Sequence, residues 1–345
     1  MAQPPTAVPN DNHSSHPYDA LTPDTILDAV ELSGRRCTGG LLALNSYENR
    51  VYRVDIDDAP PLAVKFYRPG RWSDAAIAEE HAFIARLADA DIPVVAPEAW
   101  AGGTVHTHQG FRFALFPWQP GRSAELARTE QWEMLGRYLG RMHLAGGSLH
   151  FRDRPVLSIA ERGHDAVAFL MDKGFIPSYL HDAYSSITRE LLNAISAAFA
   201  HTGEYRTIAL HGDCHLSNLL WTEHGAHFVD FDDCCMGPAV QDLWMLLTGT
   251  PAEMSRQFSD LMHGYTEFME FDARELHLVE ALRALRMLHY SAWLARRWDD
   301  PAFPRNFPWF NTQRYWEEQV LTLREQLALL QEPPLVWDEA GSFNR

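Results

Sequence analysis

The sequence has little positive charge, few cysteines and no long apolar run. Lys and Arg number 29 against 46 for Asp and Glu, which gives a net charge of −17. A protein of this sign repels nucleic acid and anionic membranes, so we expect neither as a partner. A membrane span needs roughly eighteen consecutive apolar residues, and no window of the sequence supplies them. The sequence therefore predicts a globular protein without a membrane segment.

The four cysteines, Cys37, Cys214, Cys234 and Cys235, do not have the spacing of a disulfide framework. Residues 1–20 are polar and rich in proline, and they lack both the charged and the apolar region of a secretory signal. We interpret these residues as a disordered leader. Both features indicate a reducing, cytoplasmic location.

What the sequence does contain is enough apolar material for a large core. Of its 345 residues, 46% are hydrophobic, a size that favours two lobes or domains. Alternating patterns predict strands in the first third, and 3.6-residue periodicity predicts helices in the rest. The expected strands are 40–57 (a hairpin), 60–69, 93–100, 104–110, 111–121, 207–213 and 227–233; the expected helices are 23–33, 72–92, 129–146, 165–174, 178–200, 273–298 and 312–331. The predicted class is α+β.

The stretch HGDCHLSNLLW, which begins at His211, is followed by DFDD at 230–233. A strand ending at Leu210 would place Asp213 in the loop that follows it. If the segments 219–221 and 228–229 pair as a hairpin, Asn218 and Asp230 lie together at its open end. Their oxygens suit Mg²⁺, which takes its remaining ligands from water and phosphates. An Asp, an Asn five residues later and a second Asp are the parts of a phosphoryl-transfer site, with the first Asp as catalytic base.

These residues also carry a family resemblance. HGDCHLSN with FVDFDD resembles the aminoglycoside-phosphotransferase-like branch of the protein-kinase superfamily, whose motif is H-G-D-x-x-x-x-N. Over nearly the whole chain, NSYENRVY, EEH, DLWMLL and RRWDDPAFPRNFPWF are similar to the bacterial stress response kinase A family of Ser/Thr protein kinases. The resemblance implies a two-lobed kinase-like fold with a nucleotide lobe at 21–117, a helical lobe with the acceptor cleft at 118–332 and a tail at 333–345.

The resemblance also assigns roles to single residues. It implies an ATP- and Mg²⁺-dependent kinase that phosphorylates Ser or Thr of a protein and acts as a monomer in a stress response. Asp213 and Asp230 would be catalytic, and Asn218 and Asp230 would hold the metal. Lys65, positioned by Glu80 with Glu79 as a less favoured register, would hold the ATP phosphates. Ser46 would meet the phosphates, and the hinge from Phe116 to Trp118 would meet adenine.

Three departures from the general kinase pattern change the expected mechanism. The loop at 45–49 lacks G-x-G-x-x-G, so its side chains must help to cover the phosphates, and Ser46 could contact a phosphate or receive one. Gly212 stands where protein kinases have Arg, so activation by phosphorylation of a loop is not expected. DFDD replaces DFG, which makes Asp232 a second acidic candidate for the metal.

Other interpretations of the same residues stay open. His211, Asp213 and His215 spell H-x-D-x-H, which also occurs in metal-dependent hydrolases. A catalytically silent pseudokinase would keep the fold, and a small-molecule phosphotransferase would act on an aminoglycoside, choline or homoserine-type alcohol. Both histidines are expected to have structural roles, and the aromatic residues at 298–310 are expected to pack between elements. Cys214, Cys234 and Cys235 are either small buried residues or an oxidation switch.

Overall fold

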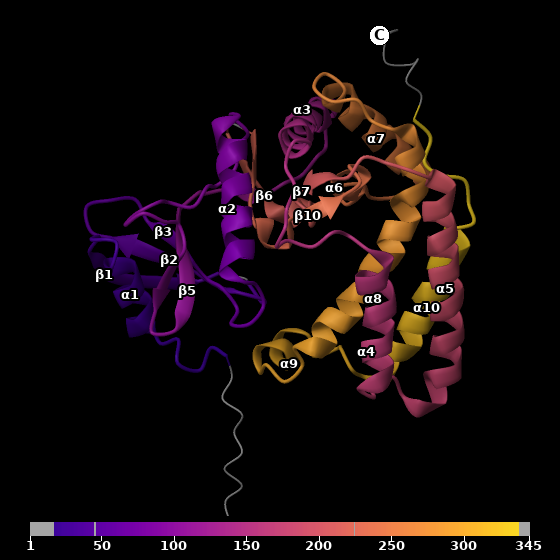
Figure 1. Ribbon diagram of the computed structural model, residues 1–345, viewed down its shortest axis with the longest axis horizontal. Helices are drawn as coiled ribbons and strands as arrows, with labels where there is room; N and C mark the ends of the chain where they lie inside the picture. Colours follow the sequence, from indigo (N-terminus) through magenta and orange to yellow (C-terminus); the bar gives the residue numbers. More distant parts are fainter. Residues whose placement is uncertain (1–16, 45, 224, 338–345) are drawn as a thin grey trace, which may run out of the picture.

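The first lobe is a five-stranded antiparallel sheet in the computed structural model, which describes residues 17–44, 46–223 and 225–337. The strand order is β1-β2-β3-β5-β4, and it stands apart from the helical lobe in Figure 1. The strands are β1 (Cys37–Ala43), β2 (Arg50–Ile56), β3 (Leu62–Phe66), β4 (His106–His108) and β5 (Phe111–Pro117). The predicted lobe boundary at residue 117 falls on the last residue of β5.

Two helices accompany this sheet. Helix α1 (Pro23–Glu31) starts at the N-cap Thr22 and packs Ile26 and Val30 on the sheet core. Helix α2 (Asp74–Asp89) starts at Ser73, whose hydroxyl accepts a hydrogen bond from the backbone of Ala76. Figure 1 shows α2 between the two lobes. Its residue Ile77 belongs to the core beside the sheet, whereas Phe83 belongs to the core of the second lobe.

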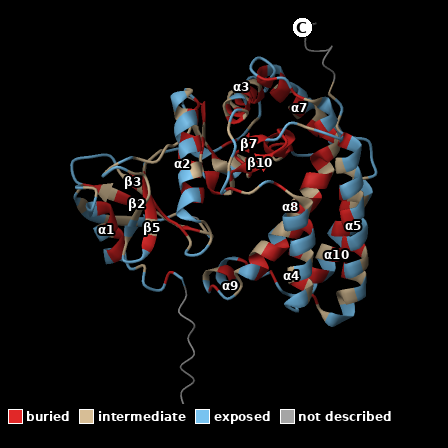
Figure 2. Cartoon of the chain, in the orientation of Figure 1, coloured by how far each residue is buried: buried red, intermediate tan, exposed pale blue. Residues whose placement is uncertain are grey.

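The second lobe is mainly helical, with two small sheets at its centre. Buried residues follow the inner faces of its long helices in Figure 2. Its helices are α3 (Thr129–Gly146), α4 (Ala166–Asp172), α5 (His181–Thr202), α6 (Val240–Trp244), α7 (Pro251–Tyr265), α8 (Val279–Arg296), α9 (Ala302–Asn306) and α10 (Gln313–Leu329). Its strands are β6 (Arg122–Ser123), β7 (Ile208–Leu210), β8 (Leu219–Thr222), β9 (Gly225–Phe228) and β10 (Cys235–Gly237). Among the described residues no helix combines the length and the apolar character needed to cross a bilayer.

Helices α3 and α7 cross at unusually short distance. A Cβ atom on Gly264 would lie 1.9 Å from the carbonyl oxygen of Glu133. Glycine is therefore required at this crossing, because any side chain would force the two helices apart. The crossing holds α3 against the strand β7 that leads into the catalytic motif.

The structure differs from the sequence expectations at several elements. Residues 93–100 form only isolated bridges at Val94 and Trp100, since Pro93 and Pro97 have no N–H for a sheet. Helix α7 was not predicted at all. The predicted helices at 165–174, 178–200 and 273–298 are each preceded or opened by a π or 3₁₀ turn.

The two expected termini are partly described. Tyr18, which falls in the expected leader, is buried and stacks on Phe111 with ring centroids 6.2 Å apart. Trp337, in the expected tail, lies edge-on to Phe258 at 6.2 Å. Ordered packing therefore extends beyond both boundaries, whereas residues 1–16 and 338–345 lie outside the described part.

Candidate active site

The catalytic loop leaves β7 through a turn that only glycine fits. Gly212 has a φ of +84°, and a Cβ there would lie 2.1 Å from the carbonyl oxygen of Asp233. Asp242 accepts hydrogen bonds from the backbone N–H groups of His211 and Gly212, each at 2.8 Å. The close approach of Asp233 explains why no Arg stands at position 212, and Asp242 fixes the loop from below.

His211 anchors the same loop through both ring nitrogens. Its Nε2 donates to the carbonyl oxygen of Val229 at 3.0 Å, and its Nδ1 accepts from the backbone N–H of Asp213 at 3.4 Å. Neither nitrogen is therefore directed at a metal. This geometry removes His211 from the H-x-D-x-H set that a hydrolase would need and gives it the structural role expected from the sequence.

Asp213 projects from this loop between two basic side chains. Nε2 of His215 lies 3.3 Å from one carboxylate oxygen, and the guanidinium of Arg286 on α8 binds the other. Burial alone would raise the pKa of Asp213, but the hydrogen bond from His215 and the charge of Arg286 outweigh it and hold that pKa well below its usual range. The lowered pKa favours the ionised form of this carboxylate.

Asn218 and Asp230 lie at the same end of the β8–β9 hairpin. Leu219 pairs with Phe228, and the N–H of Val229 donates to the carbonyl oxygen of Asn218 at 3.0 Å. The side-chain amide of Asn218 donates to the carbonyl oxygen of Asp213 at 2.9 Å. Its Oδ1 is thus the atom left for a cation, and the carboxylate of Asp230, at the same end of the hairpin, is 57% exposed. An amide oxygen and an open carboxylate suit a hard divalent cation.

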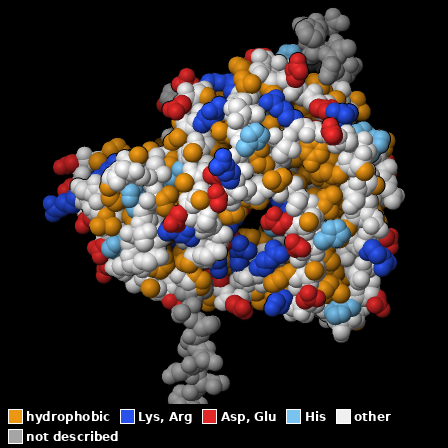
Figure 3. Space-filling model, viewed as in Figure 1, with side chains coloured by type: hydrophobic (Ala, Val, Ile, Leu, Met, Phe, Trp, Pro, Cys, Tyr) orange, Lys and Arg blue, Asp and Glu red, His pale blue; other side chains and the backbone are white. Residues whose placement is uncertain are grey.

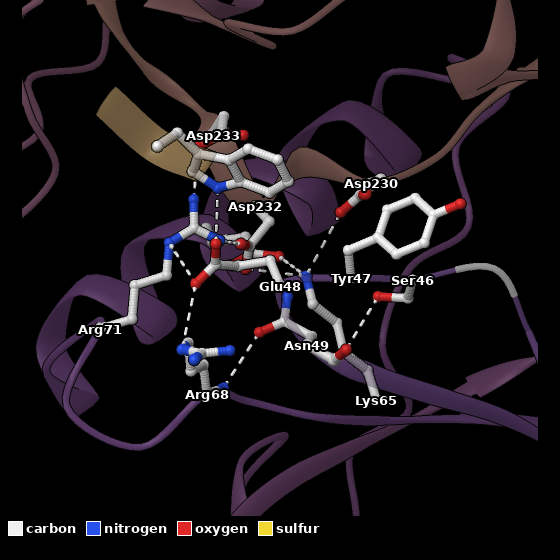
Figure 4. Close-up of polar contacts among 12 residues, drawn as sticks. Ser46, Tyr47, Glu48, Asn49, Lys65, Arg68, Arg71, Asp230, Asp232 and Asp233 are labelled. Carbon is white, nitrogen blue, oxygen red and sulfur yellow. Dashed lines mark hydrogen bonds and ion pairs between the residues drawn. The ribbon is translucent and has the colours of Figure 1, made fainter. Parts of the chain in front are cut away.

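The other carboxylates of the DFDD motif are neutralised by basic side chains (Figure 4). Nζ of Lys65 lies 3.1 Å from Asp232 Oδ1 and 3.7 Å from Asp230 Oδ1. Arg71 binds Asp232 and lies 2.6 Å from Asp233 Oδ1. Burial would lower the pKa of Lys65, but Asp232 and Glu80 raise it well above its usual value. The buried Asp232 is therefore held by protein cations rather than open to a metal.

Helix α2 supplies the partner of Lys65. Glu80 is 1% exposed, and its Oε1 lies 3.1 Å from Nζ of Lys65 while its Oε2 binds Arg154. The neighbouring Glu79 points elsewhere and accepts hydrogen bonds from three backbone N–H groups at 152–154, at 2.7 to 2.9 Å. Of the two registers considered from the sequence, the structure brings Glu80 to Lys65.

The loop between β1 and β2 lies against the helical lobe. The hydroxyl of Ser46 donates to the carbonyl oxygen of Asn49 at 3.1 Å, as in an ordinary turn (Figure 4). The carboxylate of Glu48 accepts from Nε1 of Trp293 at 2.7 Å and also binds Arg297. Tyr47 meets Phe307 edge-on at 4.9 Å. The loop thereby closes one side of the cleft between the lobes.

The hinge residues lie where β5 ends. Phe116 is opposite Ala63 of β3, and its ring packs edge-on against His81 with centroids 6.1 Å apart. The N–H of Trp118 donates to the carbonyl oxygen of Pro61 at 3.2 Å. That N–H is used within the sheet, so the segment would have to meet adenine through its other backbone groups.

Comparison with known proteins places this site in a family. The phosphotransferase enzyme family matches residues 41–279, which include every predicted site residue. The chain belongs to this family. It is 47% identical to stress response kinase A of Escherichia coli (strain K12), and 44% identical to the serine/threonine protein kinase RdoA of Salmonella typhimurium. Each alignment covers 94% of this chain and 98% of the relative.

Solved structures of two phosphotransferases have the same fold as this chain. An amicoumacin kinase in complex with AMP-PNP and Ca²⁺ superposes with a TM-score of 0.71 at 19% identity, over 93% of this chain and 97% of that one. A spectinomycin phosphotransferase with ADP gives a TM-score of 0.61 at 15% identity, over 89% and 97%. The predicted kinase-like α+β fold is confirmed, and so is the prediction of a phosphotransferase.

Four charged residues of this phosphotransferase site escaped the sequence analysis. Arg71 and Arg154 neutralise the carboxylates near Lys65, Arg286 binds Asp213, and Asp242 fixes the catalytic loop. Arg71 and Arg154 stand in connecting segments, where arginine is common, and Arg286 lies on a helix whose other residues suggest only packing. For Asp242, an acidic residue inside the apolar run VQDLWMLL was a usable signal, because a buried carboxylate needs a partner.

The cysteines of the site are buried thiols. Cys214, Cys234 and Cys235 have no exposed surface. Burial raises the pKa of Cys235 to about 12 and raises the other two well above the usual value. A thiol that stays protonated and inaccessible reacts slowly with oxidants. The structure thus favours the interpretation of these residues as small buried side chains over an oxidation switch.

Proposed function

We propose that this protein is an ATP- and Mg²⁺-dependent kinase that transfers the γ-phosphoryl group to a Ser or Thr hydroxyl of another protein. The single observation that carries the proposal is the convergence of Asp213, Asn218 and Asp230 on the cleft faced by Lys65. The Salmonella typhimurium relative, a serine/threonine protein kinase, supports a protein acceptor. The structurally similar amicoumacin kinase, solved with AMP-PNP and Ca²⁺, supports the use of a nucleotide and a divalent cation.

Each residue then has one physical task. Bound Mg²⁺ and ATP would supply the phosphoryl group and neutralise its charge. Asn218 and Asp230 would hold the cation, and Lys65, oriented by Glu80, would steady the phosphates. Asp213 would accept a hydrogen bond from the acceptor hydroxyl and orient it. Since the pKa of Asp213 is held low, the carboxylate acts mainly by orientation and receives the hydroxyl proton only as the phosphoryl bond forms.

A cytoplasmic location and action as a monomer are part of the same proposal. The four cysteines are free thiols, which suits a reducing compartment. The catalytic residues all come from one chain, so no second copy is required to complete the site. The physiological acceptor is the open element, because acceptor choice depends on the walls of the cleft rather than on the fold.

The test is phosphoryl transfer from radiolabelled ATP to a panel of protein and small-alcohol acceptors. Asp213→Asn should lower transfer by about 10²- to 10⁴-fold while Mg-ATP still binds, since only the orienting carboxylate is removed. Asp28→Asn, an exposed change on α1, serves as the matched control. Wild-type transfer rates in Asp213→Asn would refute the assignment. Transfer to small alcohols alone would refute the protein acceptor and favour the small-molecule chemistry of the structural neighbours.

A further inference from the structure

Helix α8 presents a polar and aromatic stripe to the cleft. The stripe consists of Arg286, Tyr290 and Trp293, which are spaced four and three residues apart and so share one face of the helix, and of Arg297, which directly follows the last helical residue. Arg286 binds Asp213, whereas Trp293 and Arg297 bind Glu48 of the opposite lobe. Tyr290 stacks on Trp293 at 5.7 Å and is 38% exposed. The stripe therefore runs from the catalytic carboxylate to the loop that closes the cleft.

A second arginine reaches the catalytic loop from a different element. Arg162 lies on the π-helix Ala160–Asp165, an irregular turn of the kind that is frequent at functional sites. Its guanidinium is 3.9 Å from Sγ of Cys235, and that sulfur would be 3.1 Å from a Cβ on Gly212. Only the side chain of Cys235 therefore separates Arg162 from the turn that leads to Asp213.

Arg162 differs from three nearby arginines in its charge balance. Arg71, Arg286 and Arg297 each bind a carboxylate. Within the described residues, no Asp or Glu oxygen lies within ion-pair distance of Arg162, whose recorded polar contact is the thiol of Cys235. Arg162 is half-buried, and no carboxylate among the described residues balances its charge, so it can attract an anion.

The surroundings of His289 show that this positive charge is concentrated in one place. Burial, and then the charges of Arg162, Arg296, Arg297 and Arg71, lower the pKa of His289 to about 3. Its Nδ1 is buried and makes no hydrogen bond within the described ranges. His289 is therefore neutral and adds a polar nitrogen without adding charge. Figure 3 shows basic and acidic side chains gathered around the hollow between the lobes.

We infer that Arg162, with Arg286 beside Asp213, forms a subsite for an anionic side chain of the acceptor, so that the Ser or Thr to be phosphorylated is flanked by a carboxylate or phosphate. This inference rests on the proposed function. Arginine suits such a subsite because its planar fork binds both groups with two hydrogen bonds. The exposed rings of Tyr290 and Tyr47 would flank the peptide.

The experiment compares matched peptides with the full chain. Three peptides carry the same acceptor Ser and differ only in flanking Glu, Gln or Lys, and a fourth carries phosphoserine to separate phosphate from carboxylate. We expect wild type to use the Glu and phosphoserine peptides best. Arg162→Gln should lower kcat/KM for them by about three- to tenfold, with the Gln peptide and the KM for ATP unchanged. Arg162→Glu should shift the preference towards the Lys peptide.

Controls separate this subsite from folding and from the proposed function. Arg324→Gln removes an equal charge from an exposed position on α10 and should leave the preference intact. Arg162→Lys should restore part of it. Equal or better use of the Lys peptide by wild type overturns the subsite alone.

Failure of the proposed function has a different signature. Transfer to small alcohols but to no peptide refutes the protein acceptor. In that case the subsite is supported only if kcat/KM is higher for an anionic alcohol than for its uncharged analogue and Arg162→Gln abolishes the difference. Any other result refutes the subsite. No transfer to any acceptor, with Mg-ATP still bound, refutes both.

Discussion

Asp242→Asn tests whether one buried carboxylate holds the catalytic loop in place. Asp242 is on α6 and has no exposed surface. One of its oxygens accepts from the N–H of Gly212, and the other accepts from the N–H of His211 and lies 3.3 Å from Nε2 of His143. Asparagine has nearly the same shape, but it replaces one acceptor by an NH₂ donor. Whichever way the amide turns, one loop N–H faces a donor.

The magnitude follows from these contacts. Losing a hydrogen bond to a charged group removes about 1.5–3 kcal/mol, and leaving a buried N–H unsatisfied adds about 1–3 kcal/mol. Because the two contributions overlap, we expect Asp242→Asn to lower the free energy of unfolding by about 3 kcal/mol. The loop that carries Asp213 should also shift, and a displacement near 1 Å in a catalytic group can lower the rate about 10²-fold.

Urea unfolding followed by linear extrapolation measures the first effect, and phosphoryl transfer with Mg-ATP titration measures the second. We expect kcat to fall while the Kd for Mg-ATP changes little, because Lys65 and Asp230 do not contact Asp242. Asp28→Asn on α1 is the control for removing one carboxylate charge. If Asp242→Asn unfolds at the wild-type urea midpoint and turns over at the wild-type rate, the loop is held by other contacts and this reasoning is wrong.

Two further predictions concern metal and pH. Asp230→Ala should raise the Mg²⁺ concentration needed for half-maximal ATP binding by at least about tenfold, since it removes the exposed metal carboxylate; an unaltered Mg²⁺ titration would count against that role. Glu275 is 2% exposed, and burial raises its pKa to about 7, above the unfolded value of about 4.3. Its contribution to stability is therefore fully present below about pH 4 and is lost as the pH rises through 7. The unfolding free energy of wild type should fall relative to Glu275→Gln by up to about 3 kcal/mol over that range, and parallel pH profiles would refute the shift.

The site residues that the sequence predicts lie on elements that are adjacent along the chain. Asp213, Asn218 and Asp230 stand on one loop and one hairpin, so the strand pattern alone brings them together. Lys65 and Glu80 lie on adjacent elements, and Lys65 became a candidate through its place on a strand just before the helix that carries Glu80. The strand β10, which pairs with β7, was missed because its three residues carry no alternating pattern.

Other elements were missed although a local signal was present. Helix α7 begins with a capping box of Thr250 and Glu253 around Pro251, a combination typical of helix starts. The predicted strand at 93–100 shows the opposite error, in which apolar residues outweighed two prolines. The arginine partners could not be predicted, because Arg71, Arg154 and Arg286 meet the site only through tertiary packing of segments far apart in the sequence.

The basic partners explain how four carboxylates can lie close together in this site. The carboxylates are those of Asp213, Asp230, Asp232 and Asp233. Like charges at such distances raise one another's pKa. Arg286 and the pair of Lys65 and Arg71 outweigh this effect for Asp213 and Asp232, whose pKa values are lowered. Burial keeps the pKa of Asp233 raised, although Arg71 binds that carboxylate. Arginine does not lose its proton at working pH, so this balance holds whether or not a nucleotide is bound. Asp230 remains the most exposed carboxylate of the set, and Arg162, which contacts Cys235, has no carboxylate partner among the described residues. A divalent cation at Asp230 and an anionic acceptor at Arg162 are therefore the two ligand charges that we propose for this cleft.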